Sequence, residues 1–299
     1  TPPPTPDIIP LIASSAASDV YKRQAPHRRQ AVPSRGSGRL RGEGAVTGGG
    51  SGPEELAVLA DVHGNRWALE AVFEELERRG VRRMLNLGDC LYGPLDPAGT
   101  AELLLRREIP TVCGNQDREI VAPPHEGEDP PTLDFVRREL GAEQLRWLES
   151  LPPTLATADG IFLFHGSPRD DATYLLLEVT EEGPRPRDPR EVQDRLPSTG
   201  GSLVLCGHDH LQRTLPLPDG RLVVDPGSVG LPAYHDDLPF PHVMEAGTPH
   251  ARCSLLRRAG GTWEVEQLRV EYDWPAAAAA AGRNGRPDWA HWLETGRAG

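Results

Sequence analysis

The chain has 299 residues, enough for one large domain or two small ones, and its net charge of −12 argues against general binding to a nucleic-acid backbone. Its four cysteines show no Cys-x-x-Cys spacing, which suits reduced thiols in a cytoplasmic protein better than a disulfide framework. No run of residues approaches the roughly 18 apolar residues of a membrane span, so we expect no membrane association.

The N-terminal segment is rich in proline, serine and glycine. We therefore expect a disordered leader over residues 1–52, followed by one folded domain over residues 53–299. Within the leader, Asp19–Gln24 looks like a translated sequencing adapter, and Lys22 is the only lysine of the chain. We hypothesise that residues 1–24 are a sequencing artefact. Finding their codons in a genome sequenced without that adapter would contradict this hypothesis.

The first predicted strand is apolar, covers residues 56–60 and is followed by Asp61 and His63. Such a run suits a strand that is buried on both faces. Gly64 allows a sharp turn, and residues 66–79 then place apolar side chains at helical spacing. Open α/β sheets bind ligands at the carboxyl ends of their strands. Asp61 and His63 are therefore expected at a ligand-binding edge.

A second and a third strand are predicted at residues 83–87 and 109–113, separated by a helix at residues 97–107. The second strand leads into Asp89 and the third into Asn115, each beside a glycine. Strands that alternate with helices in this way indicate a parallel or mostly parallel sheet. The polar side chains that follow the strands should then meet at one edge of that sheet.

The middle of the chain carries two further polar strand ends. A strand predicted at residues 161–164 runs into His165, and one at residues 202–206 runs into His208 and His210. The segments between them are predicted to form a loop at 122–131, two helices within 133–151 broken at Gly141, a charged loop at 181–189 and a short helix at 191–196.

The C-terminal part of the chain adds antiparallel structure. We predict a hairpin over residues 213–224 that turns at Pro218–Gly220 and leads into Asp225–Gly230. The remaining predicted elements are antiparallel strands at residues 251–256 and 262–270 and outer helices that carry Trp289, Trp292 and Leu293.

Seven side chains near the predicted strand ends are potential metal ligands: Asp61, His63, Asp89, Asn115, His165, His208 and His210. Imidazole nitrogens together with carboxylate oxygens suit Mn, Fe, Ni, Co or Zn rather than Mg or Ca. Seven ligands are too many for one such ion but suit two. Two ions about 3.5–4 Å apart can hold the attacking and leaving oxygens of a displacement at phosphorus, and a water shared between them becomes a hydroxide nucleophile. The pattern predicts two divalent transition-metal ions, with Mn as the first choice.

Six ordered motifs resemble those of the calcineurin-like metallophosphoesterases, in their compact bacterial and archaeal branch. The motifs are Asp61-Val62-His63-Gly64-Asn65, Gly88-Asp89, Gly114-Asn115-Gln116-Asp117, His165-Gly166-Ser167-Pro168, Gly207-His208-Asp209-His210 and Pro226-Gly227-Ser228-Val229-Gly230. The resemblance covers about residues 56–270. It implies an α/β fold, a four-layer α-β-β-α sandwich of two mixed β-sheets, with a dinuclear metal site at the strand ends.

The resemblance also implies which residues act at that site. The first ion would be bound by Asp61, His63 and His210, and the second by Asn115, His165 and His208, with Asp89 as the bridge. The catalytic residues would be Asp89, Asn115 and His165, the last of which would offset charge on the phosphoryl oxygens.

Two residues are predicted to contact the substrate. Asn65 matches a family position near the phosphate. Arg118 closely follows a motif, and a guanidinium binds phosphate through two nitrogens, as Arg169 would also do. An ordinary surface arginine is the alternative for both. Three histidines after the last motif are expected to be exposed to solvent, namely His235, His242 and His250.

Two residues depart from the family pattern. Many relatives carry a histidine after the metal-binding asparagine, where it can protonate the leaving oxygen. Here that residue is Gln116, which cannot act as an acid at neutral pH. We therefore expect phosphodiesters, or esters with good leaving groups, as substrates. Asp225 replaces the usual asparagine and adds a negative charge of unknown consequence.

Together these patterns predict a cytoplasmic, metal-dependent phosphoric ester hydrolase that acts on a small-molecule phosphate ester. One alternative is a protein Ser/Thr phosphatase, although we find no segment dedicated to peptide recognition. The other is a non-catalytic scaffold, because relatives of this fold can lose their metals and keep the surface for partners. The complete set of potential ligands argues against the scaffold.

Overall fold

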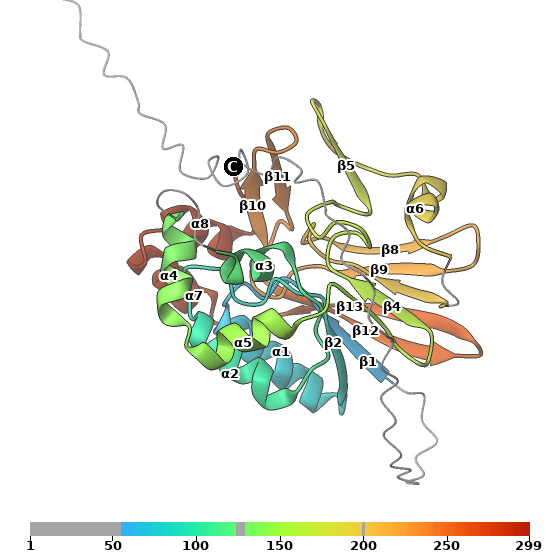
Figure 1. Ribbon diagram of the computed structural model, residues 1–299, viewed down its shortest axis with the longest axis horizontal. Coiled ribbons are helices and arrows are strands. Elements are labelled where there is room, and N and C mark those ends of the chain that lie inside the picture. Colours follow the sequence, from blue (N-terminus) through green and yellow to red (C-terminus); the bar gives the residue numbers. More distant parts are fainter. Residues whose placement is uncertain (1–54, 124–128, 199–200) are drawn as a thin grey trace, which may run out of the picture.

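Two mixed β-sheets pack against each other at the centre of the protein in the computed structural model (Figure 1). The structure describes residues 55–123, 129–198 and 201–299. The predicted leader, together with the hypothesis about residues 1–24, lies outside the described residues. No helix within the described ranges is long and apolar enough to cross a membrane.

The first sheet has the strand order β13-β12-β1-β2. Strands β1 (Glu55–Leu59) and β2 (Arg83–Asn86) run parallel, because helix α1 (Arg66–Arg78) returns the chain from the end of one to the start of the other. Strand β12 (Ala251–Ala259) pairs antiparallel with β1 and with β13 (Thr262–Val270). The sequence pattern predicted all four of these strands.

The second sheet has the strand order β3-β4-β7-β9-β8. Its centre is parallel and consists of β4 (Ile161–Phe164), β7 (Leu203–Leu205) and β9 (Leu222–Pro226). Its edges are antiparallel and consist of β3 (Thr154–Ala156) and β8 (Gln212–Pro216). The hairpin of β8 and β9 was predicted, whereas β3 was not.

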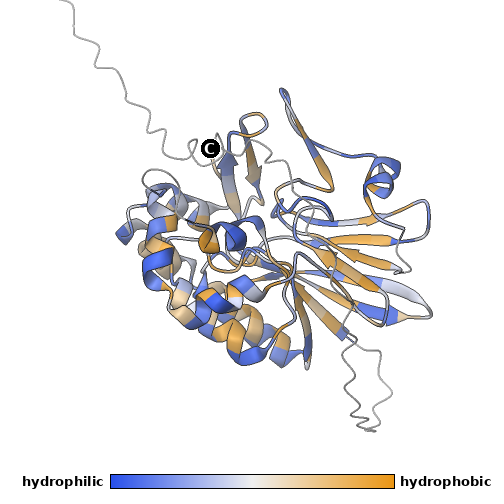
Figure 2. Cartoon of the chain, in the orientation of Figure 1, coloured by the Kyte–Doolittle hydropathy of each residue, from blue (hydrophilic) through white to orange (hydrophobic). Residues whose placement is uncertain are grey.

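Strand β1 shows how the layers are held together. Leu56 and Val58 pack in the apolar core between the two sheets, and Ala57 and Leu59 pack against the helices on the outer face. All four are at most 1% exposed, which confirms a strand that is buried on both faces. Figure 2 shows the same arrangement, since hydrophobic stretches run along the strands while the helices alternate hydrophobic and hydrophilic residues.

Four more helices join α1 on the outer face of the first sheet (Figure 1). They are α2 (Pro97–Arg107), α3 (Asn115–Val121), α4 (Pro131–Glu139) and α5 (Ala142–Ser150). Gly141 caps the N-terminus of α5 and separates it from α4, as its place in the sequence predicted. The apolar sides of these helices join the same core as the outer face of β1.

The outer face of the second sheet has a thinner cover. Helix α6 (Pro189–Arg195) places Val192 there, and Val192 and Leu196 share a core cluster with Phe162 and Phe164 of β4. The predicted α-β-β-α order is therefore present, and in the described residues its fourth layer contains one short helix.

Two β-hairpins outside the main sheets were not predicted. The first consists of β5 (Leu177–Thr180) and β6 (Gly183–Pro186), and the second of β10 (Ala233–Asp236) and β11 (His242–Glu245). The first hairpin corrects the predicted loop at residues 181–189. Strand β6 contains two prolines, which are typical of edge strands and hide a strand from pattern recognition.

Two other predictions were wrong. Residues 109–113 form only a single bridge to β2, at Thr111, because Pro110 has no N–H with which to extend the ladder. His242 was expected to be exposed but is buried, because the β10–β11 hairpin brings it against Tyr174.

The chain ends in a pair of helices, α7 (Trp274–Arg283) and α8 (Pro287–Thr295), which contact each other. Trp289, Trp292 and Leu293 are buried in the cluster that this pair forms with neighbouring residues. The predicted outer helices that carry these residues are therefore present.

Candidate metal centre

The loops after β1 and β2 bring two candidate carboxylates together. Because these strands are parallel neighbours, their carboxyl ends meet at one edge of the sheet. Backbone hydrogen bonds of 3.0 Å join the loops, from the Asp61 N–H to the Gly88 carbonyl and from the His63 N–H to the Asp89 carbonyl. Asp61 and Asp89 are 0% and 2% exposed, so their charges lie inside the protein and require compensating positive charge.

Five candidate ligands have a left-handed backbone, the conformation that favours glycine. Their φ angles are 55° for Asp61, 53° for His63, 52° for Asp89, 77° for His208 and 62° for His210. In the described part of the chain, the one other non-glycine residue with positive φ caps the end of helix α2. Such conformations cost on the order of 1 kcal/mol each and cluster at functional sites. The fold accepts backbone strain here and thereby directs these side chains at one another.

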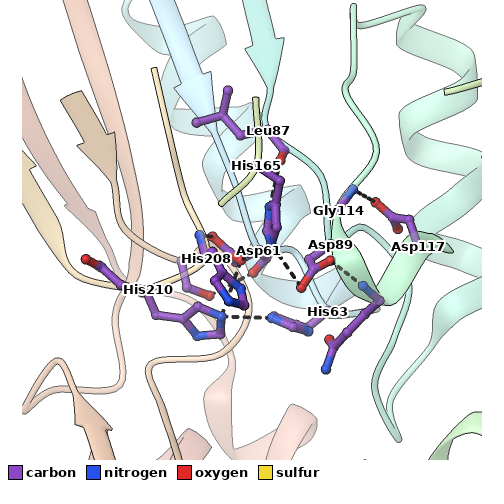
Figure 3. A network of polar contacts seen from close by, with 12 residues as sticks. Asp61, His63, Leu87, Asp89, Gly114, Asp117, His165, His208 and His210 are labelled. Carbon is purple, nitrogen blue, oxygen red and sulfur yellow. Dashed lines mark hydrogen bonds and ion pairs between the residues drawn. The ribbon is translucent and has the colours of Figure 1, made fainter. Parts of the chain in front are cut away.

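The candidate ligands form two groups (Figure 3). The first contains Asp61, His63 and His210, and the second Asp89, His165 and His208. Within each group the potential ligand atoms lie within 4.8 Å of one another, and all six residues are buried. His210 Nε2 is 3.3 Å from Asp61 Oδ1, and His165 Nε2 is 3.3 Å from Asp89 Oδ2. His165 Nε2 is also 3.8 Å from Asp61 Oδ1, so the two groups adjoin.

Each of the four histidines is oriented by a backbone carbonyl behind it. The contacts are His63 Nδ1 to Tyr92 (2.9 Å), His165 Nδ1 to Leu87 (2.8 Å), His210 Nδ1 to Leu231 (2.8 Å) and His208 Nε2 to Ala172 (3.1 Å). Because a carbonyl only accepts, each of these nitrogens carries a proton. The other nitrogen of a neutral ring then offers a lone pair to the site, which is the usual arrangement of histidines that bind metals.

These lone pairs meet in a way that fits a cation. His63 Nε2 and His210 Nε2 are 3.1 Å apart, and the Nδ1 proton of each ring is already donated to a carbonyl. Asp61 Oδ1, His165 Nε2 and Asn115 Oδ1 are buried and find no hydrogen-bond partner among the described residues. A divalent transition metal would satisfy this set of imidazole and oxygen atoms.

The charges of the site shift the pKa values of its residues in opposite directions. Burial alone would lower the pKa of His165, but the adjacent Asp89 carboxylate raises it to about 10. Burial would raise the pKa of Asp89, but the neighbouring histidines, His165 first, hold it well below its usual range. Burial lowers the pKa values of His63 and His208 to about 4. These two rings are therefore neutral at physiological pH, the form that binds metals.

Helix α3 positions the seventh predicted ligand. Asn115 is the first residue of this helix and Gly114 is its N-cap. The Gln116 N–H donates to Asp89 Oδ1 at 2.9 Å, so the start of the helix lies against the bridging carboxylate that the resemblance implies. A Cβ atom at Gly114 would lie 2.1 Å from the same oxygen, so a larger residue would not fit. The backbone of Asn115 thus lies next to Asp89, and its role as a ligand stays a prediction.

Ser228 and Gly230 support the first group from behind, a role that sequence reasoning did not assign. The Ser228 hydroxyl donates to the Asp61 carbonyl (2.7 Å) and accepts from the Leu231 N–H (2.8 Å). The Leu231 carbonyl in turn orients His210. The Gly230 N–H also donates to the Asp61 carbonyl (3.0 Å). The sequence did contain a sign of this role, because Ser228 and Gly230 belong to the last of the six motifs, which contains no metal ligand.

The two predicted substrate contacts have other partners in the structure. Asn65 is 0% exposed, accepts from the Ala68 N–H (3.1 Å) as the N-cap of α1, and donates to the Gly230 carbonyl (2.8 Å). Arg118 forms a two-pronged ion pair with Asp171, with both N–O distances 2.8 Å. The binding of phosphate by Asn65 or Arg118 stays a prediction.

Asp225 does not add an exposed charge. It is 0% exposed, and its Oδ1 accepts from the Gly227 N–H at 2.8 Å, as an asparagine oxygen would. Burial, together with the charges of Asp209 and Asp61, raises the pKa of Asp225 well above its usual value. The raised pKa favours the neutral acid, so Asp225 adds less negative charge than its place in the sequence indicated.

Comparisons with known proteins identify the family of this chain. A family model described as a calcineurin-like phosphoesterase superfamily domain matches residues 55–242. An uncharacterized protein of Methanocaldococcus jannaschii is 24% identical over 262 residues, which cover 78% of this chain and 94% of that protein.

Two solved structures are similar over most of the chain. A metallophosphoesterase from Sphaerobacter thermophilus has a TM-score of 0.63 and 25% identity, covering 81% of this chain and 100% of that one. A hypothetical protein from Pyrococcus horikoshii has a TM-score of 0.60 and 22% identity, covering 82% of this chain and 99% of that one. The predicted fold is confirmed.

Proposed function

The chain belongs to the calcineurin-like phosphoesterase superfamily, and we propose that it is a dinuclear metal-dependent phosphoesterase that hydrolyses small-molecule phosphate esters. The observation that carries this proposal is the adjoining pair of buried His/Asp groups. Buried carboxylates, unpartnered ring nitrogens and left-handed backbones all cost stability. A fold keeps such features where they bind a ligand.

The two groups divide the proposed ligands between two ions. The first ion is assigned to Asp61, His63 and His210, and the second to His165, His208 and Asn115, with Asp89 between them. The 3.3 Å contact of Asp89 with His165 and the 3.8 Å separation of His165 from Asp61 support this assignment, because they bring the groups into contact. Two divalent ions would supply a nucleophile from water near neutral pH and positive charge for the phosphoryl oxygens.

Mn is the metal that we propose, with Fe, Ni, Co and Zn as alternatives. The donor set of imidazole nitrogens, carboxylates and one amide oxygen is intermediate in hardness, which suits this series. We also propose a cytoplasmic location. Cys90, Cys206 and Cys253 are buried as free thiols, and burial raises the pKa of each, which makes them unreactive.

The leaving group would depart without a proton from a histidine of the site. Each of the four site histidines donates one ring proton to a backbone carbonyl, and its other ring nitrogen is the proposed metal ligand, so neither nitrogen is left to protonate the leaving oxygen. Gln116 has no acidic proton, and the next residue, Asp117, accepts from the Cys90 N–H (2.8 Å) and the Gly114 N–H (3.1 Å). This supports phosphodiesters, or esters with good leaving groups, as the substrates.

Hydrolysis assays test the proposal. Full-length protein loaded with Mn, Ni or Zn should hydrolyse aryl phosphodiesters, and Asp89→Asn should abolish turnover, because a neutral amide cannot provide the shared carboxylate. Turnover that survives in Asp89→Asn would contradict the proposed site. Hydrolysis of phosphoserine peptides but not of small esters would favour a protein phosphatase. A folded protein with no turnover in any metal would favour the scaffold.

A further inference from the structure

Three side chains form a chain of hydrogen bonds behind the second group. Tyr174 lies between β4 and β5, Tyr234 on β10 and His242 on β11. Tyr174 and His242 are 7% and 5% exposed. The sequence assigned no role to the tyrosines, and it predicted an exposed histidine.

The two tyrosine rings pack on the histidines of the loop at residues 208–210. The Tyr174 ring stacks on the His208 ring, with centroids 4.6 Å apart and planes 26° from parallel. The Tyr234 ring meets the His210 ring edge-on, with centroids 4.5 Å apart. The Tyr234 hydroxyl also donates to the backbone carbonyl of His208 at 3.1 Å. The tyrosines therefore contact both proposed metal ligands of this loop, His208 and His210, and both of these residues have a left-handed backbone.

The hydrogen bonds continue from Tyr234 to His242. The two tyrosine oxygens are 2.7 Å apart, and the Tyr174 oxygen is 3.1 Å from His242 Nε2. His242 Nδ1 is 2.8 Å from the Phe240 carbonyl. Because that carbonyl only accepts, Nδ1 carries a proton.

The number of protons decides how this chain is satisfied. Three contacts run from the His208 carbonyl to His242, and each needs one proton. The proton of Tyr234 serves the carbonyl, and the proton of Tyr174 serves only one of its two contacts. The third has to come from His242 Nε2. All three contacts are satisfied only when the side chain at position 242 donates to the Tyr174 oxygen.

His242 faces an acid across the β10–β11 hairpin. Asp236 is its partner in the register of the β10–β11 hairpin, so the two side chains share one face. Burial raises the pKa of Asp236, and the neighbouring His242 opposes this rise. Strand β6 also contacts β11 and carries Arg185, which is exposed and paired with Glu178 at 2.6 Å. The register partner of His242 is thus an acid.

We propose that Tyr174, Tyr234 and His242 are positioning residues that hold His208 and His210 in their metal-binding geometry. The bond from Tyr234 fixes the peptide that follows His208, and the orientation of this peptide sets the direction of both imidazoles. Hydrogen bonds behind metal ligands commonly change metal affinity by roughly 10–100-fold. The inference rests on the proposed function, because it needs the site to bind metal.

Removal of single hydroxyls tests this role. Tyr234→Phe and Tyr174→Phe keep the rings and delete the hydrogen bonds. Calorimetric titration of the metal-free, full-length variants with Mn should show affinity that is weaker by roughly 10–100-fold. The matched control is Trp263→Phe, which deletes a 3.1 Å bond to Ser202 at the opposite end of strand β7. It should lower thermal stability and leave the affinity for Mn unchanged.

Two replacements test His242 itself. His242→Gln can donate to Tyr174 as a neutral amide and should bind Mn nearly as tightly as the wild type, whereas His242→Leu should resemble Tyr174→Phe. The proposal is overturned if His242→Gln and His242→Leu bind Mn with equal affinity. It is also overturned if Tyr234→Phe binds Mn as tightly as the wild type. If the wild-type protein itself binds no metal, the proposed function fails as well. If the wild type binds Mn and only the variants behave otherwise than expected, the positioning role alone fails.

Discussion

Replacing Asn65 with alanine is predicted to destabilise the fold rather than to remove a substrate contact. The Asn65 side chain is fully buried and caps helix α1 by accepting from the Ala68 N–H (3.1 Å). It also donates to the Gly230 carbonyl (2.8 Å), which lies 165 residues away in the sequence. Asn65→Ala removes both bonds, together with a longer one to the Tyr272 hydroxyl (3.3 Å), although the family resemblance places this residue near the phosphate.

The expected fall in the free energy of unfolding is estimated from the loss of the helix cap and of the partner of the Gly230 carbonyl. Loss of an N-cap costs about 1 kcal/mol. A buried carbonyl left without a partner costs about 1–3 kcal/mol. The free energy of unfolding should therefore fall by about 2–4 kcal/mol, which corresponds to a decrease in Tm of roughly 4–16 °C for a domain of this size.

Thermal unfolding of the metal-free, full-length protein measures this effect. Asp273→Ala is the matched control, because this exposed residue caps helix α7 through one bond to the Ala276 N–H (3.1 Å). It should cost about 1 kcal/mol. If Asn65→Ala is no more destabilising than Asp273→Ala while its kcat/KM falls sharply, Asn65 acts on the substrate and the structural reasoning is refuted.

Two further substitutions test the departures from the family pattern. Gln116→His places a proton donor after Asn115 and should raise kcat/KM for monoesters with poor leaving groups by up to roughly 100-fold. An unchanged ratio of monoester to diester turnover would count against the leaving-group argument. Asp225→Asn should be more stable than the wild type at pH 7–8, because a carboxyl with a raised pKa in the folded state loses stability as the pH rises from the usual pKa of a free Asp towards the raised pKa. The two proteins should converge below about pH 4, the usual pKa of a free Asp, in urea unfolding experiments. A difference that is constant with pH would contradict the assignment.

Local sequence patterns were sufficient for much of the fold. Residues 97–107 have the composition of a helix with proline in the first turn, and α2 has the predicted bounds. Gly141 divides two helices as expected. The ends of β1 and β2 could be located because a buried strand is a continuous apolar run, and the polar residues that follow such runs are conspicuous.

Contacts between distant segments could not be predicted in this way. His242 lies in a stretch without strand-like alternation, and it is buried by Tyr174, a residue 68 positions away. Ser228 reaches the Asp61 carbonyl across 167 positions. Propensity likewise gave no indication of the left-handed backbone at His208, because it arises from the tertiary packing that directs the ring into the site.

The most direct test of the central claim is the number and position of bound metal ions. Full-length protein that is stripped with a chelator and reloaded with Mn should bind two ions per chain. Anomalous diffraction should place one among Asp61, His63 and His210 and the other among Asn115, His165 and His208, with Asp89 between the two. A protein that binds no Mn, or one whose ions lie outside these groups, would contradict the account.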